Sequence, residues 1–294
     1  ASPTTSAGFY RLSRGSEIVR AIATRQEILV YTDSTLYSMQ FTGTTDVFAF
    51  QEMADHISIA SPRAVTIANN VAYWMGHDKF YAYSGRVETL PCTLRNHVFG
   101  NLNYEQADQI VSGTNERWNE VWWFYPTGNS IVPNAYDIYN YAEQIWYYGN
   151  LTRTAWLDSG IIDYPVGATY SNNLVTHEVG TDDNTTGTAV PIVASITSAE
   201  FDIDDGHNFG FVWRIVPDLT FRGSTAASPV VTMTLYPLKG SGSGYNNPAS
   251  VGGSDNATVT RTATVPIEQF TDIIYIRVRG RQLSFKIESN QINT

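Results

Sequence analysis

The sequence has few charged residues, one cysteine and no long apolar run, and each shortage excludes a class of protein. Cys92 is the only cysteine among 294 residues, so no disulfide can form within the chain. No run of about 20 apolar residues is present, so the sequence predicts no membrane-spanning helix. Charged residues make up only 16% of the chain, whereas 13% are aromatic. Few charges and many aromatic side chains favour a subunit whose surface is largely covered by partners.

Basic residues are also scarce, and their distribution is uneven. The net charge is −10. Residues 1–189 carry 19 acidic and 10 basic side chains, whereas residues 190–294 carry 9 and 8. This balance argues against a protein that holds nucleic acid by its phosphates, because that contact needs Lys and Arg. An acidic wall repels a polyanion, however, and so lets DNA slide past without sticking.

Short strand patterns are repeated along the first part of the chain, and they predict an all-β fold. Strand–turn–strand patterns cover residues 27–41, 70–84 and 120–146, with a weaker copy at 173–178. Their spacing of about 40 to 50 residues is typical of β-propeller blades. In the third copy we expect a strand over 121–125, a turn-rich loop, and a second strand over 144–151 that continues to 158. A plain β-meander that does not close is the alternative.

We therefore expect a propeller-like β-meander domain over residues 1–189 and a β-sandwich-like domain over residues 190–294. Because the chain begins at Ala1 without a methionine, we expect that it is processed or lacks an N-terminal part. A polar stretch at 180–191 is the expected boundary. Six strands are predicted beyond it, at 199–203, 209–217, 230–235, 258–265, 273–279 and 283–288. The last two are expected to form a hairpin that turns at Gly280. The Gly- and Ser-rich stretch 239–255 is expected at an exposed tip.

Three polar motifs could carry metal chemistry, and each has a simpler interpretation. His177-Glu178 starts a zinc-protease motif, but the second histidine is missing because residue 181 is Thr. Residues 202–208 resemble the start of a calcium loop, but residue 213, the twelfth position, is Trp, so a tight turn with Gly206 at positive φ is favoured. Asp182 and Asp183 form a cation site or simply cap their loop. The sequence therefore predicts no metal site, no cofactor and no catalytic residue.

Two groups of side chains are interface or channel candidates. In the strand 273–279, Ile274, Ile276 and Val278 are expected on one face, with Tyr275, Arg277 and Arg279 on the other. Arg277, Arg279 and Arg281 then form a basic stripe, which suits a phosphate backbone, an acidic partner or only solvent. The acidic first domain favours a contact between subunits. Trp122, Trp146 and Tyr148 belong to an aromatic group that suits a core, an interface or a sugar-stacking surface.

The chain resembles a known family over roughly residues 60–290. The resemblance is carried by NAYDIYNYAEQIWYYGNLTRTAWLD (134–158), HEVGTDD (177–183), AEFDIDDGHNFGFVWRIVPDLTF (199–221) and RVRGRQLSFKIES (277–289). These segments resemble tail proteins of short-tailed bacteriophages, in particular the tail nozzle or hub, also described as a tail tubular or packaged-DNA-stabilising protein.

The resemblance implies a non-enzymatic virion protein, assembled in the host cytoplasm as a ring, a homohexamer by expectation. Its channel would pass the genome transiently, without stable binding of nucleic acid or membrane. It would also support an adaptor, fibres or spikes. Two alternatives are kept open. One is a phage carbohydrate-binding or depolymerising module for receptor recognition, and the other is a cellular propeller enzyme or adhesin.

Overall fold

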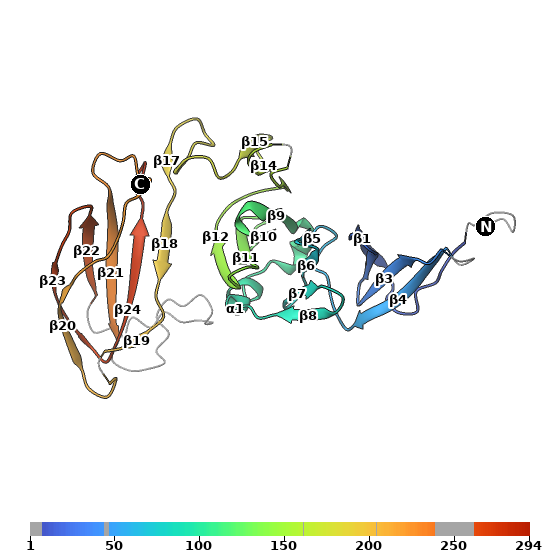
Figure 1. Ribbon diagram of the computed structural model, residues 1–294, viewed down its shortest axis with the longest axis horizontal. Coiled ribbons are helices and arrows are strands. Elements are labelled where there is room, and N and C mark those ends of the chain that lie inside the picture. Colours follow the sequence, from blue (N-terminus) through green and yellow to red (C-terminus); the bar gives the residue numbers. More distant parts are fainter. Residues whose placement is uncertain (1–7, 44–46, 161, 204, 239–261) are drawn as a thin grey trace. The chain divides into compact units, whose positions relative to one another are not determined.

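The computed structural model describes residues 8–43, 47–160, 162–203, 205–238 and 262–294. It confirms the all-β prediction, because almost every element is an antiparallel strand (Figure 1). The chain divides into an N-terminal unit, Ala1–Glu178, and a C-terminal unit, Val179–Thr294. No helix in the described ranges is long and apolar enough to cross a membrane.

In its described residues the N-terminal unit contains four consecutive antiparallel sheets. The first holds β1 (Ile18–Ala23), β2 (Ile28–Thr32), β3 (Thr35–Phe41) and β4 (Phe48–Asp55). The second holds β5 (Val65–Ala68), β6 (Val71–Met75), β7 (Phe80–Tyr83) and β8 (Val87–Leu90). The third holds β9 (Val111–Asn115), β10 (Glu120–Tyr125), β11 (Ala135–Asn140) and β12 (Ile145–Gly149). The fourth holds β13 (Ala155–Leu157), β14 (Val166–Ala168) and β15 (Leu174–Thr176).

Three short helical elements precede or interrupt the third sheet. They are α1 (Arg95–Phe99), η1 (Tyr104–Gln109) and η2 (Glu116–Trp118). Within each of the first three sheets the strands follow one another in chain order, so each sheet is a four-stranded meander, as in a propeller blade. The repeat predicted from the sequence is therefore present in the described residues.

The third sheet differs from its prediction. The expected turn-rich loop contains β11, which pairs with both β10 and β12. The expected strand over 144–158 is two strands, because β12 ends at Gly149 and β13 pairs with β14 in the next sheet. The sequence did not predict β11 because polar turn residues surround it. In the structure Ala135 and Asp137 of this strand are buried.

One apolar core joins the first three sheets. Its largest buried side chains include Tyr31 on β2, Trp74 on β6 and Trp123 on β10, each on the second strand of its sheet. The ring of Tyr31 lies edge-on to Trp74, and Phe80 of the second sheet contacts Trp123 of the third. Cys92 is partly buried against the same core. A repeated aromatic position thus packs each sheet on the next.

Tryptophan N–H groups connect neighbouring sheets. Trp123 Nε1 donates to the Ala64 carbonyl at 3.0 Å, Trp146 Nε1 to Pro91 at 2.8 Å, and Trp156 Nε1 to Thr114 at 2.8 Å. Each acceptor lies in or beside the preceding sheet. The bond of Trp123 satisfies a buried indole group, and all three bonds fix the spacing between sheets.

In the C-terminal unit a larger and a smaller sheet face each other across an apolar core. The larger follows the order β18 (Ala194–Thr197), β24 (Gln282–Ser289), β21 (Val230–Leu238) and β22 (Ala263–Glu268), with β19 (Phe201–Asp202) also on β24. The smaller holds β20 (Gly210–Ile215) and β23 (Ile274–Gly280). Alternation along each strand turns one row of apolar residues inwards.

The hairpin expected at Gly280 does not form. β23 pairs with β20 in the small sheet, whereas β24 pairs with β21 in the large one, so the chain changes sheets at this point. A Cβ on Gly280 would lie 3.0 Å from the backbone of Leu238, and Arg281 N donates to the Leu238 carbonyl. Position 280 therefore requires glycine, because a side chain there would be too close to the backbone of Leu238.

The unit boundary lies after residue 178 rather than 189. The stretch expected as a boundary loop contains β16 (Asp182–Asp183) paired with β17 (Val190–Pro191). The carboxylate of Asp182 also accepts a hydrogen bond from the Asn293 N–H near the C-terminus. These contacts attach the stretch to the C-terminal unit. The tip predicted for 239–255 lies outside the described residues.

Candidate functional site

The small sheet of the C-terminal unit exposes one face of β23. Ile274, Ile276 and Val278 are buried in the core, while Tyr275, Arg277 and Arg279 are exposed. The predicted alternation along this strand is therefore confirmed. It arises because successive side chains of a strand point to opposite sides, so a buried apolar row leaves the other row in solvent.

β20 adds aromatic rings to the same surface. Phe211 lies opposite Arg279 in the strand register, and the pairing shifts between Val212 and Arg214. At this irregularity the Trp213 ring stacks on Tyr275, with ring centres 6.3 Å apart. The bulge thereby places a large ring beside its cross-strand neighbour.

We call this surface the aromatic–arginine face. It comprises Phe209, Phe211, Trp213, Tyr275, Arg277 and Arg279. The guanidinium of Arg279 lies 5.5 Å from the centre of the Phe209 ring, and that of Arg214 lies 4.6 Å from the Trp213 ring. Trp213 is 50% exposed and Tyr275 is 72% exposed. Exposed rings beside arginines form a patch of the kind found at interaction surfaces.

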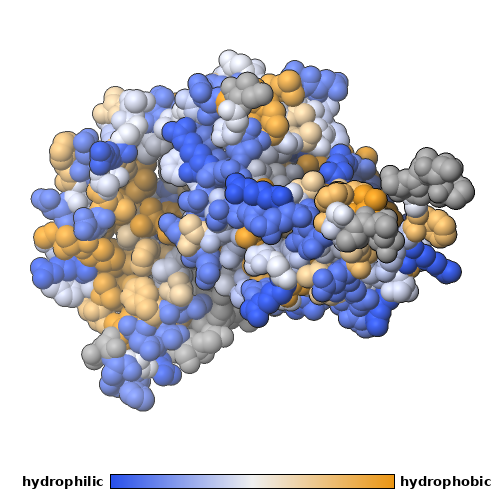
Figure 2. Space-filling view, turned by 45° about the vertical axis from the view of Figure 1, so that its right-hand side comes forward, coloured by the Kyte–Doolittle hydropathy of each residue, from blue (hydrophilic) through white to orange (hydrophobic). Residues whose placement is uncertain are grey.

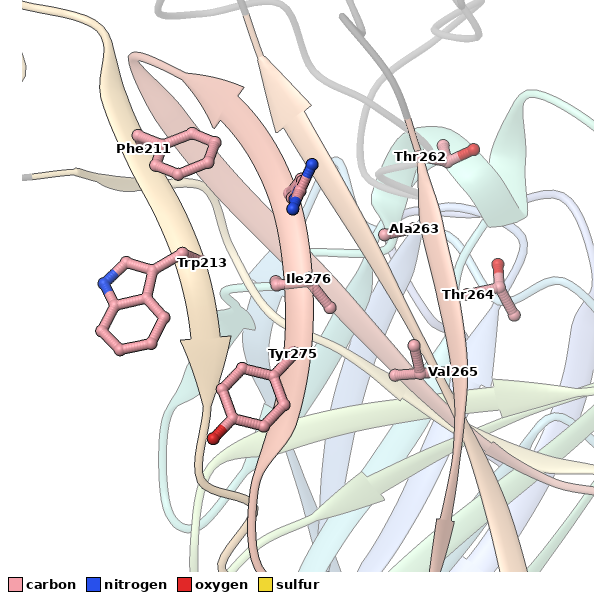
Figure 3. Close-up of a pocket in the computed structure, with 9 residues that line it drawn as sticks. Phe211, Trp213, Thr262, Ala263, Thr264, Val265, Tyr275 and Ile276 are labelled. Atoms are coloured by element: carbon pink, nitrogen blue, oxygen red, sulfur yellow. The ribbon is translucent and has the colours of Figure 1, made fainter.

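A cleft of about 1100 Å³ borders the aromatic–arginine face (Figure 3). Its wall on one side is β22, through Ala263, Thr264 and Val265, and on the other side β23. In Figure 3 the rings of Trp213 and Tyr275 lie beside each other, on the side away from β22. Hydrophobic residues gather on the surface over the C-terminal unit, at the left of Figure 2.

Arg281 does not belong to the predicted basic stripe. It follows the last residue of β23, and its Nε and Nη2 donate to the Gly206 carbonyl at 2.9 and 2.7 Å. Gly206 has a φ of 72°, as the favoured turn requires. Because the chain leaves β23 at Gly280, the alternation that orients Arg277 and Arg279 ends before Arg281. Arg281 therefore holds a turn, and the exposed stripe is reduced to two arginines.

The tryptophans predicted as interface candidates are packed inside the N-terminal unit. Trp122 is buried in an aromatic cluster with Tyr136 and Trp156, with ring centres about 5 Å apart. Trp146 packs on Phe80 and Trp123. Both therefore stabilise contacts between strands and sheets.

Tyr148 differs from the two tryptophans because it lies on the edge strand β12 and is exposed. Its ring centre is 4.7 Å from that of His97. Of the three predicted aromatic candidates, this side chain alone remains available on the surface.

Two acidic groups lie beside the aromatic cluster of the N-terminal unit. Glu120 accepts a hydrogen bond from Trp122 Nε1 at 3.0 Å. Burial raises the pKa of Glu120 to about 7, the Trp122 bond opposes this shift, and the nearby Glu178 carboxylate adds to it. Burial likewise raises the pKa of Glu178, against the effect of Arg117. A carboxyl group with a pKa near neutrality changes its charge around pH 7. Glu120 is therefore a pH-sensitive group rather than one half of a structural ion pair.

The polar motifs considered as metal sites are engaged in local contacts. His177 Nε2 accepts a hydrogen bond from Arg153 Nε at 2.9 Å, and its ring packs on Trp156. Asp182 accepts from Asn293 N, and Asp183 accepts from Thr185 N at 2.8 Å. Within the described ranges, no group of three or more His, Cys, Asp and Glu side chains could hold a metal ion.

The sequence analysis did not identify the aromatic residues of the aromatic–arginine face, although their spacing indicates them. Phe209, Phe211 and Trp213 follow one another at every second position of a predicted strand. That spacing places three rings on one side of the strand. Comparison with models of known protein families, and with curated protein sequences, finds no match for this chain.

Proposed function

We propose that this chain is a structural subunit of a ring-shaped virion assembly, the tail nozzle of a short-tailed bacteriophage, and that it performs no catalysis. The observation that carries the proposal is the aromatic–arginine face. Trp, Tyr and Arg dominate the binding energy of protein interfaces, and a monomer rarely leaves several of them exposed together. An interface with another protein subunit is the simplest use of such a surface.

The N-terminal unit supports the same function. Its first three sheets share one core, and tryptophan hydrogen bonds connect the third sheet with the second, an arrangement that suits a scaffold. Its sequence carries 17 acidic and 10 basic side chains, a net charge of −7. An acidic scaffold suits the wall of a channel through which DNA passes, because like charges prevent the polymer from binding.

The proposal extends to the place of the protein in the virion. The resemblance described for residues 60–290 implies a ring below the portal and adaptor, with fibres or spikes attached. In this assembly the chain contributes part of the DNA ejection channel and a platform for other tail proteins. DNA contacts it only in passing.

The first test is the stoichiometry and shape of the purified chain, by mass photometry and negative-stain imaging. We expect a closed ring, six-fold by the resemblance, with a central hole wide enough for duplex DNA. A monomer or a trimer without a channel, at micromolar concentration, would contradict the proposal.

A second candidate function is glycan binding during receptor recognition. The specific observation is the open cleft beside the exposed rings of Trp213 and Tyr275, since aromatic faces stack on sugar rings. A glycan-binding screen with the intact chain and with Trp213→Ala tests it. This candidate requires a glycan that the intact chain retains and Trp213→Ala does not.

A further inference from the structure

The C-terminal unit exposes a second apolar surface, at the β18 side of its large sheet. Ile196 on β18 lies opposite Ile287 of β24, which in turn lies opposite Met233 of β21. Ile287 and Met233 pack in the core, whereas Ile196, in the same row, is 67% exposed. The inward-facing apolar row therefore continues beyond the part of the large sheet that the small sheet covers.

The position of the small sheet explains this exposure. The β20–β23 pair packs mainly against β21 and β22, at the other end of the large sheet. Among the described strands β18 pairs with β24 alone, so it is an edge strand. Phe201 on β19 lies opposite the buried Leu283 and is also exposed. We call Ile196 and Phe201 the apolar edge.

Acidic residues lie next to the apolar edge, whereas basic residues lie on the aromatic–arginine face. Glu200 and Asp202 flank Phe201 in the sequence, and Asp202 is exposed, with one oxygen accepting from Gln282 Nε2 at 2.9 Å. The aromatic–arginine face presents Arg277 and Arg279 instead. An apolar strip with acidic neighbours is complementary to rings with basic neighbours, and such complementarity selects partner and orientation.

We propose that the aromatic–arginine face of one copy of this chain packs against the apolar edge of the next copy. The two surfaces differ: one lies on the small sheet, which packs on β21 and β22, and the other lies at the β18 end of the large sheet. The contact is therefore head-to-tail rather than two-fold, and its repetition builds a ring when the rotation between copies closes. The inference rests on the proposed ring function and specifies which surfaces close it.

Two variants of the full chain separate the surfaces. The face variant carries Trp213→Glu and Arg277→Glu, and the edge variant carries Ile196→Arg and Phe201→Arg. Each retains one intact surface. Measured alone by mass photometry, each is expected to lose the ring and give single chains. Mixed in equal amounts, they are expected to form two-chain particles, because the intact edge of one fits the intact face of the other.

Matched controls place the same changes elsewhere. Trp118→Glu alters a tryptophan that is 52% exposed, and Leu174→Arg alters an aliphatic residue that is 77% exposed, both in the N-terminal unit. Both controls should retain the wild-type ring. Circular dichroism and thermal unfolding verify that every variant is folded.

The outcomes separate this inference from the proposed function. If the wild-type chain is monomeric, both fail. If the wild type forms a ring and the two variants also do, the ring stands and the surfaces assigned here are wrong. If the variants are single chains and their mixture forms no two-chain particle, the head-to-tail pairing is wrong.

Discussion

At the residue scale, Glu120 gives the N-terminal unit a response to pH. Its pKa of about 7 is raised above the ordinary glutamate value of 4.5, chiefly by burial. The native state therefore binds a proton that the unfolded chain has already released between these two values. The stabilisation due to Glu120 is complete below about pH 4.5 and is lost as the pH rises to about 7.

Glu120→Gln should remove this pH dependence. The amide keeps an oxygen for the Trp122 N–H but cannot ionise. Between pH 5 and 8 the unfolding temperature of the wild type should fall more than that of the variant, by about 2–4 °C, a value that allows for the partial exposure of the group. Differential scanning fluorimetry measures the difference. Glu143→Gln, at an exposed position, is the control and should follow the wild type.

At the element scale, the structure explains why the middle strands of the first two sheets were predicted from the sequence and their outer strands were not. The hairpins read from the sequence, such as β2–β3 and β6–β7, are the middle strands of their sheets, and most of their residues are buried. Their partners β1 and β4 contain no buried residue, and β5 and β8 contain only four residues each. An outer strand is specified by pairing with its neighbour, which leaves little pattern in its own sequence.

The candidate site was predictable to a similar degree. Alternation placed Arg277 and Arg279 correctly, since they lie within one regular strand. Arg281 was misplaced because its position depends on the change of sheet at Gly280, and that change follows from contacts with the distant residue Leu238. Trp122 and Trp146 were ambiguous for a different reason, because aromatic alternation fits a core and an interface equally well.

The hydrogen bonds between neighbouring sheets lead to a second prediction. Trp123→Phe keeps a large ring in the core but removes the N–H that the Ala64 carbonyl accepts. The buried carbonyl keeps the bond from Met75 N, at 3.2 Å, and loses one of its hydrogen bonds, which costs about 0.5–1.5 kcal/mol. Urea denaturation measures the change in unfolding free energy. Trp118→Phe is the matched control at an exposed position, and an equal loss in both variants would contradict the role of the bond.

Contact between the third and fourth sheets depends on a glycine. A Cβ on Gly113 of β9 would lie 2.2 Å from Cδ1 of Trp156. Gly113→Ala must therefore displace the Trp156 ring from Trp122 and from the Thr114 carbonyl, at a cost of about 1–3 kcal/mol. Urea denaturation followed by tryptophan fluorescence tests this. Gly160→Ala, where no atom lies within 4 Å of the new Cβ, should be close to neutral.

At the scale of the whole molecule, the two units have separate cores. The core around Trp123 and the core around Ile267 have no residue in common. We therefore expect two unfolding transitions in calorimetry of the monomeric face variant. Trp123→Phe should lower only one of them. Ile267→Ala, which empties a fully buried position, should lower only the other, by about 2–5 kcal/mol in stability. A single transition shifted by both changes would mean that the units unfold together.

The partial burial of Cys92 has a practical consequence for studying the assembly. Burial raises the pKa of its thiol to about 12, so almost no thiolate exists near pH 8 and the group reacts slowly with alkylating reagents. The chain has no other cysteine. A cysteine introduced at an exposed surface position would therefore take up a fluorescent or spin label almost alone. The distance between labels on adjacent copies could then be measured in the intact particle.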